Sequence, residues 1–213
     1  MSRVNIVTPE RALELLKAGN VNFQENLRTN RDLLDEVKEG CGGQAPFATV
    51  LSCIDSRMPT EMIFDQGIGD IFSIRIAGNF SNEDIIGSME FAAAASTTRL
   101  IVVMGHTACG AVKGACDARV GADFGDLDAL AKMLKKLYPA VDAVIEPTDK
   151  EERTSENSKF VNEVAEKNVG LTIDNIRAGS PAIEKRMSAT DDSRIMIVGA
   201  MYDICTGEVT FDR

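Results

Sequence analysis

Short segments rich in apolar residues recur along the chain at 47–52, 71–76, 100–104 and 194–201. Each has the length of a strand, and most are apolar at consecutive positions rather than at every second one. Parallel strands that are covered on both faces have this composition, because neither row of side chains meets water. The four segments therefore predict buried strands of a parallel sheet.

Helical signals alternate with these segments. Thr8, Pro9 and Glu10 combine an N-cap, a first-turn proline and an acidic residue, and Gly19 followed by Asn20 predicts the end of that helix. A second helical stretch to about residue 37 completes an N-terminal helical arm. Further helices are expected near residue 59 and over 81–95, 111–116, 127–138, 159–176 and 181–187.

Strands that alternate with helices indicate an α/β fold with a mostly parallel central sheet of about four strands, flanked by helices. A turn at 205–208 leads into 209–211, which predicts an antiparallel C-terminal edge strand. The polar stretch 147–158 is expected to be an exposed loop. We find no internal repeat, and we expect one domain over 1–213, with the arm at 1–40 and the core at 41–213.

Composition narrows the range of partners and locations. The chain is 44% apolar and 26% charged, as in globular proteins, and its net charge is −10. No basic run offers phosphates a partner, which argues against nucleic acid and anionic membranes. No apolar run approaches the roughly 20 residues of a membrane span, and the amino terminus lacks the apolar core of a signal peptide. A cytoplasmic location is expected.

Candidate metal ligands follow two of the predicted strands. Cys53 comes directly after the first strand, and His106, the single histidine of the chain, follows the third strand with Cys109 three positions on. Sites in open α/β sheets form beyond the carboxyl ends of the strands, so these side chains are expected at one edge. Two thiolates and an imidazole are ligands that Zn²⁺ prefers. Taken singly, each residue is as well explained by packing or by a loop; together they favour a zinc site.

The remaining cysteines are less suited to this site. Cys116 is seven residues beyond Cys109 and is interpreted as core packing, and Cys41 and Cys205 as free thiols. Five cysteines, an odd number, do not suggest a disulfide framework. The fourth ligand position falls to water or to a carboxylate.

Asp55 and Arg57 add a charged pair beside the first cysteine. In extended chain Cys53, Asp55 and Arg57 point to the same side, so Arg57 can hold Asp55 through a bidentate fork and keep it ionised. A surface ion pair is the simpler reading of these two residues alone. Zinc lowers the pKa of its bound water to about 7, and the resulting hydroxide suits attack on a small electrophile such as CO2.

Cys53-x-Asp55-x-Arg57 together with His106-x-x-Cys109 resembles the signature of the β-class carbonic anhydrases. The resemblance implies reversible hydration of CO2 to bicarbonate and a proton by zinc-bound hydroxide, with zinc held by the two cysteines and the histidine. It implies that Asp55 and Arg57 act as a catalytic dyad, in which Asp55 orients the zinc water or, in a closed inactive state, becomes the fourth zinc ligand.

The same resemblance assigns the substrate pocket and the assembly. Gln44 matches a glutamine that hydrogen-bonds substrate, and Phe72 and Phe91 match apolar pocket positions. Without the family, both phenylalanines read as core aromatics and Gln44 as a polar loop residue. A homodimer is the implied minimum unit, with sites near the subunit interface, and a tetramer stays open.

One departure from the family bears on regulation. Members that bicarbonate switches off carry a tryptophan where this chain has Val50, although Arg75 and Tyr202 match the other two members of that pocket. The incomplete pocket predicts no strong bicarbonate switch and an open, water-bound zinc.

Two other functions remain open from the sequence. One is hydrolysis of CS2 or COS on the same scaffold, which depends on the shape of the pocket. The other is a non-catalytic zinc or thiol protein, for which an arginine-held Asp55 has no use.

Overall fold

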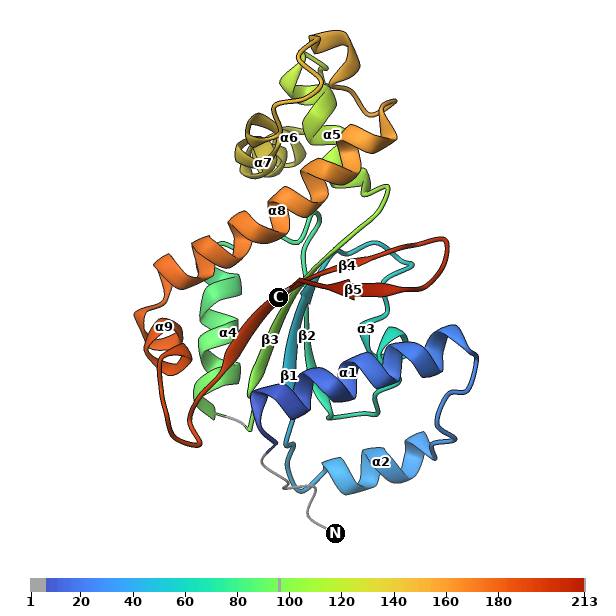
Figure 1. The fold of residues 1–213 in the computed structure, drawn as a ribbon, viewed down its shortest axis with the longest axis vertical. Coiled ribbons are helices and arrows are strands. Elements are labelled where there is room, and N and C mark those ends of the chain that lie inside the picture. The colour runs from blue at the N-terminus through green and yellow to red at the C-terminus, as the bar shows by residue number, and fades with distance from the viewer. Residues whose placement is uncertain (1–6, 96, 213) are drawn as a thin grey trace.

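A computed structural model describes residues 7–95 and 97–212, which form an α/β fold around one sheet (Figure 1). The sheet has five strands in the order β2-β1-β3-β4-β5, of which the first four are parallel and the last is antiparallel. The predicted fold class is confirmed. The strands are β1 (Ala48–Ser52), β2 (Ile71–Arg75), β3 (Leu100–His106), β4 (Met196–Tyr202) and β5 (Val209–Phe211).

Helices connect the strands and carry the capping signals that the sequence contains. Thr8 Oγ1 accepts a hydrogen bond from the Arg11 amide at the first helix, and Asn157 Oδ1 accepts one from Phe160 at the longest. The helices and 3-10 turns are α1 (Pro9–Gln24), α2 (Leu33–Gly40), α3 (Thr60–Ile63), α4 (Glu83–Ala95), α5 (Gly110–Arg119), α6 (Asp128–Leu134), η1 (Lys135–Leu137), α7 (Tyr138–Ala143), η2 (Lys150–Glu152), α8 (Ser158–Gly179) and α9 (Pro181–Met187).

Helices cover both faces of the sheet, as Figure 1 shows. On one face Ala12 and Leu16 of α1 pack against Val50 and Val102. On the other face α4, α8 and α9 meet the alternate side chains, among them Val103 of β3. Both rows of strand side chains are therefore buried, and this explains why the strands are apolar at consecutive positions.

A third layer of helices stands beyond the carboxyl ends of the strands. In Figure 1, α5, α6 and α7 lie above the sheet. Helices α5 and α7 pack on α8, and α6 packs on α5. The buried residues between these helices form one cluster, which includes Leu134 and Phe160 and also contains Cys53 and Cys109. The candidate ligands therefore lie where the sheet meets the helical layer, out of contact with bulk water.

The predicted end of the first helix is wrong. Helix α1 continues through Gly19 and Asn20 to Gln24, and the two residues serve packing instead. A Cβ atom at Gly19 would lie 1.8 Å from the Phe64 carbonyl oxygen, so only glycine lets α1 approach this closely. Asn20 accepts a hydrogen bond from the Val209 amide and donates one to the Gly207 carbonyl. A signal that usually ends a helix is here a tertiary contact.

The second predicted helix starts later than expected. Residues 25–32 form a loop, in which Asn26 has φ 55°, and α2 begins at Leu33. Leu33, Leu34 and Val37 of α2 are exposed. The predicted arm at 1–40 therefore consists, in its described part, of one helix packed on the core and one helix with an open apolar side.

Smaller differences concern the ends of other elements. Strand β3 runs two residues further than expected, to His106, and the predicted helix 127–138 divides into α6, η1 and α7. The stretch 147–158 contains one 3-10 turn and is held by the Arg153 guanidinium, which donates to the carbonyls of Val141 and Val144. Within the described residues, no helix is long and apolar enough to cross a membrane. The single-domain boundary 1–213 stays a prediction.

Candidate metal centre

Two neighbouring parallel strands deliver the three candidate ligands. Cys53 follows the last residue of β1, His106 ends β3, and Cys109 is the residue before α5. The strands are paired in parallel, so their carboxyl ends share one edge of the sheet. The ligand atoms of the three residues lie within 4.8 Å of one another, and all three side chains are buried.

The imidazole of His106 is oriented for metal binding. Its Nδ1 lies 3.0 Å from the Thr107 carbonyl oxygen, which can only accept, so Nδ1 carries the proton. Its Nε2 is buried and has no hydrogen-bond partner within the described residues. A buried nitrogen without a partner is costly unless a ligand satisfies it. The unpartnered Nε2 therefore fits a metal ion.

The two thiols are spaced as a tetrahedral zinc site requires. Cys53 Sγ and Cys109 Sγ are 4.0 Å apart, and two sulfurs at a Zn–S distance of about 2.3 Å are about 3.8 Å apart. The Gly78 amide donates to Cys53 Sγ at 3.4 Å. Hydrogen bonding from the Cys109 thiol lowers the pKa of Cys53, and the same contact raises that of Cys109. The first negative charge of the pair therefore rests on Cys53.

Asp55 is turned toward Arg57 and lies outside the cluster of three ligand atoms. Arg57 Nε donates to Asp55 Oδ1 at 2.8 Å and Arg57 Nη2 to Oδ2 at 2.6 Å, which is the bidentate fork expected from the sequence. These hydrogen bonds hold the pKa of Asp55 well below its usual range. Asp55 is therefore an ionised hydrogen-bond acceptor at neutral pH.

Arg75 ties the edge strand to the loop that carries this pair. Its Nε donates to the Cys53 carbonyl at 3.0 Å, and its Nη2 donates to the Asp55 carbonyl. The loop that follows β1 is therefore fixed by the neighbouring strand β2, which places Cys53 and Asp55 together.

Comparison with known proteins assigns the chain to a family. The sequence profile of the family described as carbonic anhydrase matches residues 48–209. The chain belongs to the carbonic anhydrase family. Among curated relatives, Carbonic anhydrase 2 of Mycobacterium tuberculosis is 32% identical over 93% of this chain and 90% of its own length.

Solved structures of the β class share the fold. The β-carbonic anhydrase CcaA matches with a TM-score of 0.71 at 24% identity, over 95% of this chain and 93% of that one. A tetrameric β-carbonic anhydrase of the ascomycete Sordaria macrospora matches with a TM-score of 0.66 at 24% identity, over 82% of this chain and 84% of that one. At 24% identity these structures show that the fold is shared. Together with the family match and the curated relatives, they confirm the predicted resemblance to the β class.

One of the predicted substrate residues of this carbonic anhydrase, Gln44, lies away from the three ligands within one chain. Gln44 precedes β1 and Cys53 follows it, and the four-residue rise of β1 alone separates its ends by about 13 Å. Phe72 and Phe91 line one open depression of about 860 Å³ beside the edge strand β2. Phe91 is 62% exposed, so the alternative reading of it as a core aromatic is wrong.

The other three cysteines are placed as the sequence predicted. Cys116 is fully buried in the helical layer, and burial raises the pKa of its thiol to about 12. Cys41 and Cys205 are exposed free thiols.

Two asparagines of α8 contact the loops of the metal centre and were missed from the sequence. Asn162 Oδ1 accepts a hydrogen bond from the Ala108 amide, and Asn168 Nδ2 donates one to the Gly78 carbonyl. The partners are 54 and 90 residues away in the sequence. Two asparagines in a long helix carry no local signal of such contacts.

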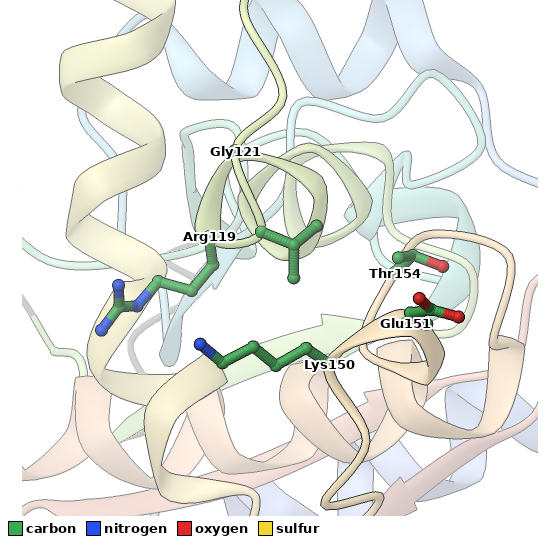
Figure 2. A pocket seen from close by; sticks show the side chains of 6 residues that line it. Arg119, Gly121, Lys150, Glu151 and Thr154 are labelled. Atoms are coloured by element: carbon green, nitrogen blue, oxygen red, sulfur yellow. The ribbon is translucent and has the colours of Figure 1, made fainter.

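A further depression lies on the outer side of the helical layer. Figure 2 shows its lining, which includes Arg119, Gly121, Lys150, Glu151 and Thr154, and its volume is about 680 Å³. Arg119 is at the far end of α5 from the Cys109 end. The depression is therefore separate from the metal centre of this carbonic anhydrase.

Proposed function

We propose that this carbonic anhydrase holds Zn²⁺ with Cys53, His106 and Cys109 and reversibly hydrates CO2 to bicarbonate and a proton. The observation that carries the proposal is the buried cluster of two thiols and an imidazole whose Nε2 has no partner within the described chain. Zinc in such a ligand set acts as a Lewis acid, which lets a water molecule lose a proton near neutral pH.

Asp55 and Arg57 are proposed as the catalytic dyad. Asp55 accepts a hydrogen bond from the reacting water and orients it, and Arg57 fixes the carboxylate in the ionised form. Both carboxylate oxygens are occupied by Arg57, which supports the open state, in which water is the fourth ligand. Asp55 is proposed to become a ligand only in a closed state, after Arg57 has released it.

Weak regulation by bicarbonate is part of the same proposal. Val50 is fully buried in the core on the α1 face, at the position where regulated members carry tryptophan. Arg75 spends two of its donors on the carbonyls of Cys53 and Asp55. These contacts support a structural role for Arg75 in the ligand loop. They leave fewer of its donors for binding a bicarbonate ion.

The substrate pocket is proposed to form between two copies of the chain. Gln44 lies at the opposite end of β1 from Cys53, so a second copy is needed to bring this amide to a metal centre. The exposed Phe91 and the half-buried Phe72 at the edge of the sheet offer an apolar surface for that contact. A homodimer is the proposed minimum unit, and a tetramer is compatible with it.

The proposed location is the cytoplasm. All five cysteines are free, as is usual in a reducing compartment. The net charge of −10 argues against nucleic acid and anionic membranes as partners.

The decisive experiment compares two aspartates that make the same contact. Asp55→Asn should keep one zinc per chain and lower CO2 hydration by on the order of 100-fold, because the acceptor that orients the water is lost. Asp142→Asn is the matched control, since Asp142 accepts an equivalent fork from Arg119 away from the site. Stopped-flow hydration assays and metal analysis provide the readouts.

Each alternative function has its own result. A wild-type protein that contains zinc and hydrolyses CS2 or COS but not CO2 would assign the other small-electrophile reaction. Zinc without any of these activities would support a structural or thiol protein, and a protein purified without metal that binds none on addition would contradict the zinc proposal.

A further inference from the structure

Helix α8 touches the loop that carries His106 and Cys109, and it also touches the turn at Gly78, whose amide donates to Cys53 Sγ. It runs from the helical layer of α5–α7 down along the sheet, as Figure 1 shows, and it packs against β3, β4 and α7. It contributes no ligand of its own. Two of its asparagines, six positions apart, nevertheless hydrogen-bond to backbone next to the ligands: Asn162 to the Ala108 amide and Asn168 to the Gly78 carbonyl.

Asn162 holds the loop between His106 and Cys109. Ala108, which lies between these two ligands, has φ 53°. Residues other than glycine rarely adopt this left-handed backbone conformation. Its amide donates to Asn162 Oδ1 at 2.9 Å. The backbone donor determines which amide atom of Asn162 faces it, so this side chain acts as an acceptor. The contact stabilises the turn that brings imidazole and thiolate together.

Asn168 holds the backbone that faces the other cysteine. It is 3% exposed, and its Nδ2 donates to the Gly78 carbonyl at 2.8 Å. Gly78 has φ 79°, and a Cβ atom there would lie 2.8 Å from Leu137 Cδ1. The amide of the same residue donates to Cys53 Sγ. Asn168 therefore acts as a donor and fixes the backbone that directs a hydrogen bond at the first ligand.

We propose that Asn162 and Asn168 are positioning residues: Asn162 fixes the turn between His106 and Cys109, Asn168 fixes the Gly78 backbone that donates to Cys53 Sγ, and together they set the affinity for zinc. Neither side chain touches a ligand atom; each acts through the backbone of a loop. Both asparagines come from α8. This helix therefore fixes the loop of His106 and Cys109 and the turn at Gly78 relative to each other. The inference rests on the proposed zinc site and adds the residues that preorganise it.

The test uses one substitution with opposite expected results. Asn162→Asp keeps an oxygen acceptor for the Ala108 amide, whereas Asn168→Asp replaces the donor to the Gly78 carbonyl with an acceptor. Zinc dissociation constants from chelator competition should stay within about 3-fold of wild type for Asn162→Asp. They should rise by about 10–100-fold for Asn168→Asp, the usual effect of losing a group that orients a ligand. Asn168 is more deeply buried than Asn162, so a carboxylate also costs more there; the leucine variants add no charge and test the loss of each hydrogen bond by itself.

Leucine variants and a control complete the design. Asn162→Leu and Asn168→Leu should both weaken zinc binding by about 10–100-fold and alter the visible spectrum of the cobalt-substituted protein, because the ligand geometry changes. Asn175→Leu, an exposed position on the same helix, should change neither. Circular dichroism of each apoprotein identifies variants that do not fold, and the aspartate pair then decides.

Two results would overturn the inference. One is wild-type zinc affinity in folded Asn162→Leu and Asn168→Leu apoproteins that have merely lost thermal stability, since that assigns the asparagines to packing alone. The other is equal weakening by Asn162→Asp and Asn162→Leu. A wild-type protein without measurable zinc affinity contradicts the proposed function instead, so the two failures are distinguishable.

Discussion

At the scale of single residues, cysteines of one chain differ in chemistry because their surroundings differ. Cys53 and Cys109 are buried beside an imidazole, Cys116 is buried among apolar side chains, and Cys41 and Cys205 face water. A thiol reacts as its thiolate, so its pKa and its exposure decide its reactivity.

Reaction with a soluble disulfide reagent should therefore separate the thiols. In the zinc-loaded protein at pH 8, two thiols, those of Cys41 and Cys205, should react quickly. Cys116 should stay unreactive until the protein unfolds, because burial raises its pKa to about 12. Removal of zinc by a chelator should add Cys53, whose pKa is lowered, whereas Cys109, whose pKa is raised, should react much more slowly. The release of the coloured thiol product counts the groups.

A double variant, Cys41→Ser with Cys205→Ser, is the control for this count. It should show no fast reaction while zinc is bound. A fast thiol that persists in this variant would contradict the placement of Cys116 or the protection of the ligands.

At the scale of elements, α1 shows how a local signal is overruled by packing. Gly19 lies in the middle of the helix, where glycine is unfavourable by about 1 kcal/mol relative to alanine. The close approach of α1 to the Phe64 carbonyl explains why the residue is tolerated there.

Gly19→Ala should lower the free energy of unfolding by about 2–3 kcal/mol, because the new methyl group overlaps a backbone atom that cannot move freely. Gly170→Ala on α8 is the matched control: nothing lies within 4 Å of the added Cβ, so stability should rise by up to about 1 kcal/mol. Urea unfolding of both variants gives the comparison, and equal stability of Gly19→Ala and wild type would refute this account of the helix.

The connection between α1 and α2 is held by one buried carboxylate. Asp65 Oδ2 accepts hydrogen bonds from Asn22 Nδ2 at 3.0 Å and Thr29 Oγ1 at 2.8 Å. Burial by itself would raise the pKa of Asp65, but the hydrogen bonds from Asn22 and Thr29 outweigh it and the pKa is lowered. A lowered pKa in the folded state adds stability above the unfolded value of about 3.9, and this stability is lost as pH falls further.

Asp65→Asn should therefore lower the free energy of unfolding at pH 7 by about 2 kcal/mol, since charged hydrogen bonds are lost while the left-handed backbone at φ 47° still suits asparagine. The difference from wild type should narrow below about pH 4. Urea unfolding of the apoproteins from pH 7 to pH 3 checks this, and a difference that is constant with pH would show that charge plays no part.

At the scale of the whole molecule, one chain brings the three candidate ligands together but leaves Gln44, the predicted substrate residue, at the other end of β1. The three ligands and the Asp55–Arg57 pair meet within one copy. Phe72 and Phe91 line an open depression along the edge strand β2. Metal binding should therefore not require the dimer, whereas catalysis should require it.

Phe91→Lys tests this separation. A charge on an exposed aromatic of the proposed interface should raise the dimer dissociation constant by on the order of 30-fold, as loss of an interface hot spot does. Zinc content should be unchanged and CO2 hydration should fall as the dimer dissociates. Sedimentation velocity and stopped-flow assays on the same samples give the readouts.

Ile145→Lys is the control for this test, because Ile145 is the more exposed residue, at 76%, and lies far from β2 in the loop after α7. Its assembly and activity should match wild type. Dimeric, fully active Phe91→Lys protein would exclude the Phe91 surface as the contact between copies.

The sheet, the candidate metal ligands and the charged pair beside them were predictable from the order of residues in the chain. Strands of a parallel sheet are recognisable from their apolar composition, and residues that follow such strands share an edge, so Cys53, His106 and Cys109 were predictable from their order in the chain. The fork between Asp55 and Arg57 was predictable because the two residues are neighbours.

Features that depend on contacts between distant segments became visible only in the folded chain. The course of α1 through Gly19, the exposure of Phe91 and the contacts of Asn162 and Asn168 with the ligand loops have no local signal. The contacts of Gly19, Asn162 and Asn168 depend on which backbone atom another element brings close to them. Local interactions are encoded at fixed spacing, whereas these partners lie 45 to 90 positions apart and meet only once the fold has formed.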